Sequence, residues 1–73
     1  MAEFSYEILE EMGVFFTSKN GWTKEINMVS WNGSEGKIDI RNWSPDHSRM
    51  GKGISLTKEE FQALKELMDE IEL

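Results

Sequence analysis

The chain has 73 residues, a net charge of −6 at pH 7, no cysteine and a single histidine, His47. A chain this short forms at most one domain, residues 1–73, with a small core and a thin margin of stability. Its composition excludes disulfides, thiolate metal sites and histidine clusters, so we expect oligomerisation to supply additional stability. No segment reaches the ~18 apolar residues of a membrane span, and MAEFSYEILEE lacks a secretory-signal pattern, so we expect a soluble, cytoplasmic protein.

The charge is distributed unevenly. Residues 1–16 and 54–73 each have a net charge of −4, whereas residues 17–53 have six basic and four acidic side chains and a net charge of +2. All three tryptophans lie in this middle segment. Local fields decide what binds, so the acidic total does not exclude a nucleic-acid ligand, although an excess this small is also common by chance.

Residues 4–17 contain two overlapping patterns. Apolar residues alternate in FSYEI, as in a strand, whereas three- and four-residue spacings through Met12 would suit a helix. Gly13 and the β-prone run VFFT disfavour one continuous helix, so we predict a strand with an irregularity near Gly13. Lys19-Asn20-Gly21 is then the turn into the next strand.

Residues 22–31 and 37–43 are predicted to form an antiparallel hairpin around the NGSEG turn. The KIDIR run alternates polar and apolar residues, which places Ile38 and Ile40 on the inward face. The opposite face would then carry Lys37, Asp39, Arg41 and Trp43. The register of residues 22–31 stays open, because their apolar residues occur at both parities and a bulge would change the faces.

A C-terminal helix is predicted over about residues 58–72. Thr57 is a good N-cap, Glu60 completes a capping box, and one apolar stripe follows: Phe61, Leu64, Leu67, Met68 and Ile71. Before the helix, Pro45 ends the third strand, residues 47–53 form a loop, and residues 53–56 form a short strand. The predicted architecture is α+β, with a four-stranded antiparallel sheet followed by one helix (β-β-β-β-α).

The sequence contains no catalytic constellation. His47 follows Asp46, but no activated nucleophile accompanies them. Gly51 and Gly53 do not have phosphate-loop spacing. We therefore predict that the protein is not an enzyme and uses no metal or cofactor.

Single-strand nucleic-acid binders combine positive charge along the phosphates with exposed aromatic faces for unpaired bases. Arg41 and Trp43 are two residues apart on one predicted strand face, with Lys37 beside them. Lys24 shares its strand with the other tryptophans, Trp22 and Trp31. The alternative is that some tryptophans fill the core; Trp22 and Trp31 fit either position, and Trp43 is expected on the surface.

The segments KIDIRNWSPD and GKGISLTKEEFQALKEL resemble the YdbC-like bacterial relatives of the eukaryotic transcriptional coactivator positive cofactor four. The resemblance covers nearly the whole chain. It implies a curved four-stranded antiparallel sheet followed by one helix, a homodimer paired through helices and sheet ends, and single-stranded DNA bound across the sheets with little sequence preference. Unlike the eukaryotic branch, this chain has no basic aromatic turn at NGSEG and no serine-rich tail.

The resemblance also implies contact residues. Arg41 matches the family's arginine in IDIR, and Lys52 matches the basic position before GISL. Trp43 falls one residue short of the family's stacking tryptophan. The strands and turn expected to carry further contacts contain Lys24, Asn27, Trp31 and Lys37.

The predicted function is therefore single-stranded DNA binding by a homodimer in transcription or DNA maintenance. Two rivals remain. An acidic dimer with exposed aromatic residues would also suit an adaptor that docks a basic protein. RNA would use the same surface, because only contacts to the 2′-hydroxyl separate the two ligands.

Overall fold

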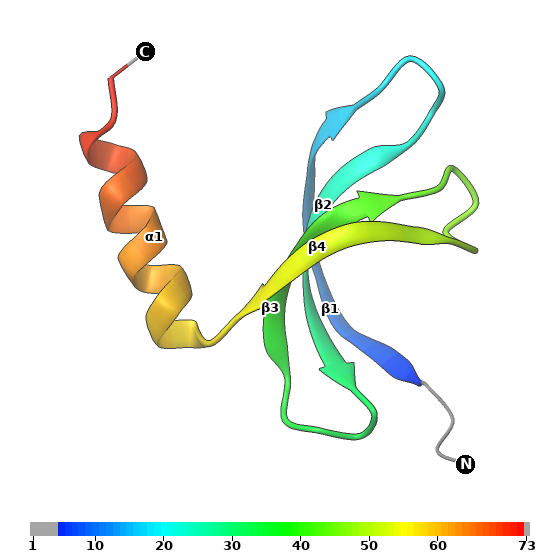
Figure 1. Cartoon of the computed structure of the whole chain (residues 1–73), viewed down its shortest axis with the longest axis horizontal. Helices are drawn as coiled ribbons and strands as arrows, with labels where there is room; N and C mark the ends of the chain where they lie inside the picture. The colour runs from blue at the N-terminus through cyan, green and yellow to red at the C-terminus, as the bar shows by residue number, and fades with distance from the viewer. Residues whose placement is uncertain (1–4, 73) are drawn as a thin grey trace.

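A computed structural model describes residues 5–72, which form one four-stranded sheet and one helix (Figure 1). The elements are β1 (Tyr6–Thr17), β2 (Thr23–Trp31), β3 (Lys37–Trp43), β4 (Met50–Leu56) and α1 (Lys58–Glu70). The strands lie in the order β1-β2-β3-β4, and each neighbouring pair is antiparallel. The predicted α+β architecture is confirmed. No helix among residues 5–72 is long and apolar enough to cross a membrane.

The helix begins as its sequence predicts. The Thr57 side chain accepts a hydrogen bond from the Glu60 backbone amide, and the Glu60 carboxylate accepts one from the Thr57 amide. These bonds form the capping box, which satisfies two amides that would otherwise lack partners. The helix ends at Glu70, two residues before the predicted boundary, because Ile71 has an extended backbone.

Strand β4 is longer than predicted. It begins at Met50 rather than at Gly53, since Met50 pairs with Trp43 across the sheet. The predicted loop over residues 47–53 is therefore wrong in its second half. Gly53 allows this pairing because a Cβ at that position would overlap both the Arg41 side chain and the Ile40 carbonyl oxygen.

The pairing of β1 with β2 shifts register between Ile8 and Glu10, between Glu11 and Gly13, and again between Val14 and Phe16. The irregularity predicted near Gly13 is thus one of three. By contrast, β2 and β3 pair without interruption, so the bulge considered for residues 22–31 lies in its partner strand instead. Irregularities of this kind bend a strand and increase its twist, and the sheet is strongly curved (Figure 1).

Both faces of β3 contain buried side chains, although only the face of Ile38, which is 4% exposed, was predicted to be buried. The predicted alternation along β3 holds, but the face expected to be open contains buried side chains: Asp39 and Trp43 are 0% exposed. Tyr6 of β1 reaches Trp43 of β3, with 5.7 Å between ring centroids, although a flat sheet would separate those strands by about 9.6 Å. We call this curled side the concave face. The expected exposure of Trp43 is corrected accordingly.

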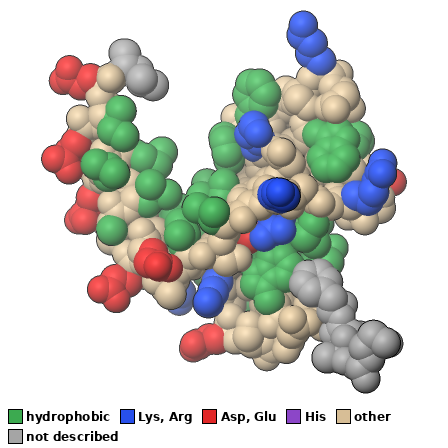
Figure 2. All heavy atoms as spheres, in the orientation of Figure 1, with side chains coloured by type: hydrophobic (Ala, Val, Ile, Leu, Met, Phe, Trp, Pro, Cys, Tyr) green, Lys and Arg blue, Asp and Glu red, His purple; other side chains and the backbone are tan. Residues whose placement is uncertain are grey.

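The apolar side of the molecule is largely uncovered. Among the described elements, α1 contacts only β3 and β4, and it contains no buried residue. Its apolar side chains face the sheet across open space while its acids point away (Figure 2). The radius of gyration is 13.5 Å, compared with about 11 Å for a compact domain of this length, because the helix stands off the sheet.

Candidate nucleic-acid interface

Four rings, from β1, β2, β3 and the loop between β3 and β4, form a continuous row on the concave face. Tyr6 of β1 lies 5.7 Å from both Trp31 of β2 and Trp43 of β3, measured between ring centroids. The imidazole of His47 stacks on Trp43 at 4.3 Å, with an angle of 4° between the planes. We call Trp31, Tyr6, Trp43 and His47 the aromatic row. Tyr6 is 38% exposed, and 36% of the His47 side chain is accessible, so the row presents rings to solvent.

Arg41 lies beside this row. Its guanidinium carbon is 4.7 Å from the ring centroid of Trp31, within the range of a cation–π interaction. Nε and Nη2 donate to the two carboxylate oxygens of Asp39 at 2.6 Å and 2.8 Å, and Nη1 donates to the Gly51 carbonyl at 3.2 Å. The guanidinium is therefore held in one orientation, with 15% of its side chain exposed.

A buried polar chain supports this arrangement. The Trp31 indole N–H donates to Ser55 Oγ at 3.0 Å, and Ser55 Oγ donates to Asp39 Oδ1 at 3.0 Å. Asp39 thus connects Trp31 and Arg41 through direct and bridged bonds. Burying a carboxylate is tolerated only when such partners satisfy it, so this network fixes both groups.

A second carboxylate lies under the other end of the row. Glu25 accepts hydrogen bonds from Thr23 Oγ1, from Asn27 Nδ2 at 3.2 Å and from His47 Nε2 at 2.9 Å. Burial alone would raise the pKa of Glu25, but these hydrogen bonds and the nearby imidazole outweigh it, so the pKa lies below its usual value. Glu25 is therefore an anchored anion.

The predicted site residues do not all meet at one surface. Trp31, Arg41 and Trp43 come together on the concave face. Asn27 is only 1% exposed; it lies buried beneath this face and donates a hydrogen bond to Glu25. This burial corrects the expectation that Asn27 is an accessible contact residue. Lys52 is exposed on edge strand β4.

Trp22 and Lys24 lie elsewhere. Together with Ser18, Asn20 and Asn42 they line a separate pocket of about 200 Å³. Lys24 Nζ donates to Asn42 Oδ1 at 3.0 Å, and these two residues share the parity of the isoleucines on the apolar side. Trp22, which the sequence left open between the surface and the core, therefore lies away from Trp31 and Trp43.

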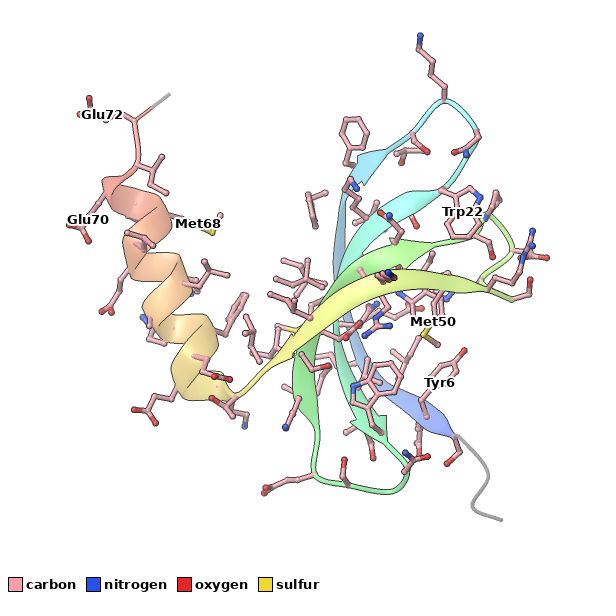
Figure 3. All side chains as sticks on the ribbon, viewed as in Figure 1. Tyr6, Trp22, Met50, Met68, Glu70 and Glu72 are labelled. Carbon is pink, nitrogen blue, oxygen red and sulfur yellow. The ribbon has the colours of Figure 1, made fainter. Side chains whose placement is uncertain are left out.

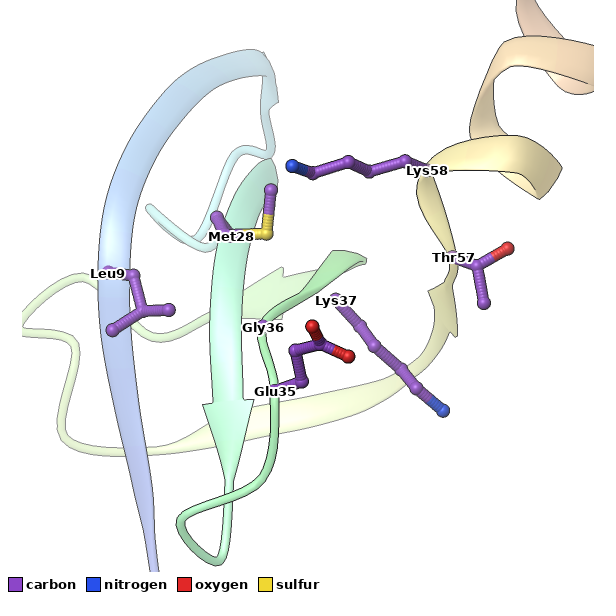
Figure 4. A pocket seen from close by; sticks show the side chains of 7 residues that line it. All are labelled: Leu9, Met28, Glu35, Gly36, Lys37, Thr57 and Lys58. Carbon is purple, nitrogen blue, oxygen red and sulfur yellow. The ribbon is translucent and has the colours of Figure 1, made fainter.

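Lys37 contributes to a larger pocket of about 450 Å³ between the sheet and the start of the helix (Figure 4). Leu9, Met28 and Gly36 form the sheet side of its lining, and Thr57 and Lys58 form the helix side. Its apolar floor belongs to the uncovered side of the sheet. Lys37 itself has the strand parity of Asp39 and Arg41 and pairs with Val29, so it lies at the end of β3 on the same face as these residues.

Two members of the row, Tyr6 and His47, were not predicted as site residues. Figure 3 shows Tyr6 and Met50 extending into the same region from opposite edges of the sheet. The alternation of FSYEI indicated a strand, but nothing local indicates that its ring reaches a tryptophan two strands away. For His47, the sequence does contain a local indication: the turn at Pro45 follows Trp43 directly, so a residue of this turn can fold back over the tryptophan ring.

Comparison with known proteins identifies similarities over most of the chain. Residues 18–67 match the sequence model of the family described as Transcriptional Coactivator p15 (PC4). A bacterial protein from Treponema pallidum (strain Nichols), described as uncharacterized, is 48% identical over 71 residues, which cover 97% of this chain and 84% of the relative. The match to a bacterial protein agrees with the resemblance to bacterial relatives of positive cofactor four. The matched segment contains the whole aromatic row except Tyr6.

Proposed function

Because this chain belongs to the transcriptional coactivator p15 (PC4) family, we propose that it binds single-stranded DNA across its concave face, in a role related to transcription. The observation that supports this proposal is the aromatic row beside the anchored guanidinium of Arg41. Exposed rings stack on unpaired bases of any sequence, so the proposed binding has little sequence preference.

The electrostatics of the concave face suit a polyanion better than the net charge of −6 suggests. Asp39 is neutralised by its bidentate pair with Arg41, and Glu25 is paired with His47. Most of the remaining acids lie on the helix and on β1. Backbone phosphates would therefore meet the positive charges of Arg49 and Lys52, which form no salt bridge within residues 5–72. Both side chains are exposed, in the loop and strand that adjoin the neutral Arg41–Asp39 pair.

We further propose that the working unit is a homodimer. The helix stripe exposes Leu67, Met68 and Ile71 by 54–59%, and strands β1 and β4 expose further apolar side chains. The exposed apolar side chains of these strands are Leu9, Met12, Val14, Phe15, Phe16 and Ile54. A contiguous uncovered surface of this kind is characteristic of an interface. In a two-fold dimer, the helix stripe of each copy could pack against the apolar side of the sheet of the other copy.

The test is fluorescence anisotropy of a labelled oligothymidine titrated with the protein at low and moderate salt. A duplex and an oligouridine of equal length serve as parallel ligands. We expect tight binding to the single strand, weak binding to the duplex, and a loss of affinity as salt rises, with a slope of about 0.7 per neutralised phosphate.

Failure to bind any single strand at low salt would contradict the proposal and favour a protein-docking role for the acidic helix. Tighter binding to oligouridine would indicate an RNA ligand on the same surface, since the 2′-hydroxyl is the only group that distinguishes the sugars. Light scattering of the same samples reports the oligomeric state.

A further inference from the structure

The loop between β3 and β4 holds His47 in an unusual backbone conformation. Its φ is +63°, a left-handed value that few non-glycine residues adopt. The loop is fixed by its own hydrogen bonds: His47 N donates to Ser44 O, Ser44 N donates to Arg49 O, and Arg49 N donates to Ser44 Oγ, each at 2.9 Å. The imidazole is therefore presented by a loop that does not depend on the imidazole for its shape.

The ring has one covered face and one anchored edge. Trp43 covers one face at 4.3 Å, and Nε2 points at both carboxylate oxygens of Glu25 at 2.9 Å. Since a carboxylate only accepts hydrogen bonds, Nε2 carries the proton. The 36% of the side chain that remains accessible must therefore come from the opposite face and from the Nδ1 edge.

We propose that His47 is a base-contacting residue at the outer end of the aromatic row, where its open face stacks on an unpaired base. Trp43, fully buried, acts beneath it as support and does not touch the ligand. Glu25 is a positioning residue, because its carboxylate fixes the plane of the imidazole. This inference rests on the proposed single-strand binding and names one residue that carries it.

The experiment compares wild type, His47→Phe and His47→Ala by anisotropy with oligothymidine at one pH and one salt concentration. Both variants keep a Cβ on the same left-handed backbone, so backbone strain is matched. Gln62→Ala, on the exposed helix surface, is the control. Near-ultraviolet circular dichroism of each variant reports whether the tryptophan packing is retained.

We expect His47→Ala to weaken binding by about fivefold or more, the effect of losing one stacked base. His47→Phe should bind within about threefold of wild type, since it keeps a ring.

A direct readout comes from proton NMR, because the chain has one histidine and its imidazole resonances need no assignment strategy. A stacked purine should shift both ring C–H resonances upfield when a purine-containing single strand is added. If wild type binds DNA while His47→Ala binds equally well and the imidazole resonances do not move, His47 makes no base contact and this inference is overturned. If wild type itself does not bind, the proposed function fails together with this inference.

Discussion

Trp43 is the residue whose predicted and observed positions differ most. Its side chain is 0% exposed, and it lies between Tyr6 and His47. We therefore predict that Trp43→Ala lowers the free energy of unfolding by about 3–5 kcal/mol, the usual cost of truncating a buried large aromatic residue. Urea denaturation at fixed protein concentration measures this loss. A variant that keeps wild-type stability and only binds DNA less tightly would place Trp43 back among the contact residues.

Trp43→Phe is the matched control for this prediction. The indole nitrogen of Trp43 is buried, and no described residue accepts a hydrogen bond from it. Replacing a buried donor that has no partner removes its desolvation penalty of roughly 1–3 kcal/mol. This gain offsets part of the lost packing, so Trp43→Phe should be far less destabilising than Trp43→Ala.

Arg41 and Asp39 should behave as one unit. Arg41→Ala would leave the fully buried Asp39 carboxylate without its bidentate partner, and removing one member of a buried pair costs about 3–5 kcal/mol. We predict that the double variant Asp39→Asn, Arg41→Gln is more stable than Arg41→Ala, although both lose DNA affinity. Denaturation of wild type, Asp39→Asn, Arg41→Gln and their double variant forms a double-mutant cycle that measures this coupling. Additive losses would contradict it.

For the residues of β3, the sequence predicts which side chains share a face but not which face is buried. The alternation in KIDIR correctly placed Asp39, Arg41 and Trp43 on one face, because strand parity is a local property. Which face is buried depends on how far the sheet curls, and the curl follows from the register shifts in β1. Those shifts depend on pairing between distant segments, so the burial of Trp43 could not be derived from its neighbours.

At the scale of elements, the β3–β4 loop should govern acid stability. Hydrogen bonds from the Ser48 side chain and backbone and from the Ser44 hydroxyl lower the pKa of Asp46 to about 2, and the pKa of Glu25 is also lowered. Below the ordinary carboxyl pKa of about 4, the unfolded chain binds protons that the folded chain does not. The free energy of unfolding that Asp46 and Glu25 contribute is therefore fully present above about pH 5 and is lost as pH falls towards 2.

The prediction is that Asp46→Asn flattens the fall of the melting temperature between about pH 5 and pH 2. Ser48→Ala removes a donor to Asp46, so it should flatten the same region partially. Circular dichroism melts across this pH series measure both effects. A wild-type melting temperature that stays constant down to pH 2 would show that these carboxylates are not linked to folding.

The accuracy of the element predictions follows from the range of the interactions that define each element. The helix start was predicted correctly because Thr57 and Glu60 bond to each other within one turn. The first half of β4 was missed because Met50 joins the sheet only through Trp43, which precedes it by a whole loop. In the same way, the positions of Trp22 and Trp31 stayed open because the sequence does not show where the turn ends and β2 begins, which is at Thr23.

At the scale of the whole molecule, one chain leaves its apolar surfaces unpaired. The apolar residues that are buried within residues 5–72 are Val29, Ile38 and Trp43. Such a small core stabilises a domain of this size only marginally. In the proposed homodimer, the uncovered helix stripe and the outer apolar side of the sheet would lie in the interface, so folding should be coupled to association.

The final prediction tests this coupling. Leu67 is 55% exposed on the helix stripe, and Leu67→Glu would place an unpaired charge in the proposed interface. We expect the dimer dissociation constant to rise at least about a hundredfold, because burying an unpaired charge costs several kcal/mol. Gln62→Glu adds the same charge to the acidic surface of the same helix and should leave the dimer intact.

Light scattering after size exclusion measures the mass of each species, and denaturation at several protein concentrations measures the coupling. Wild type and Gln62→Glu should elute as dimers, with stabilities that rise with concentration. Leu67→Glu should elute as a monomer of lower and concentration-independent stability. A wild-type monomer whose stability does not depend on concentration would contradict the homodimer, since its exposed stripe would then have no second copy to cover it.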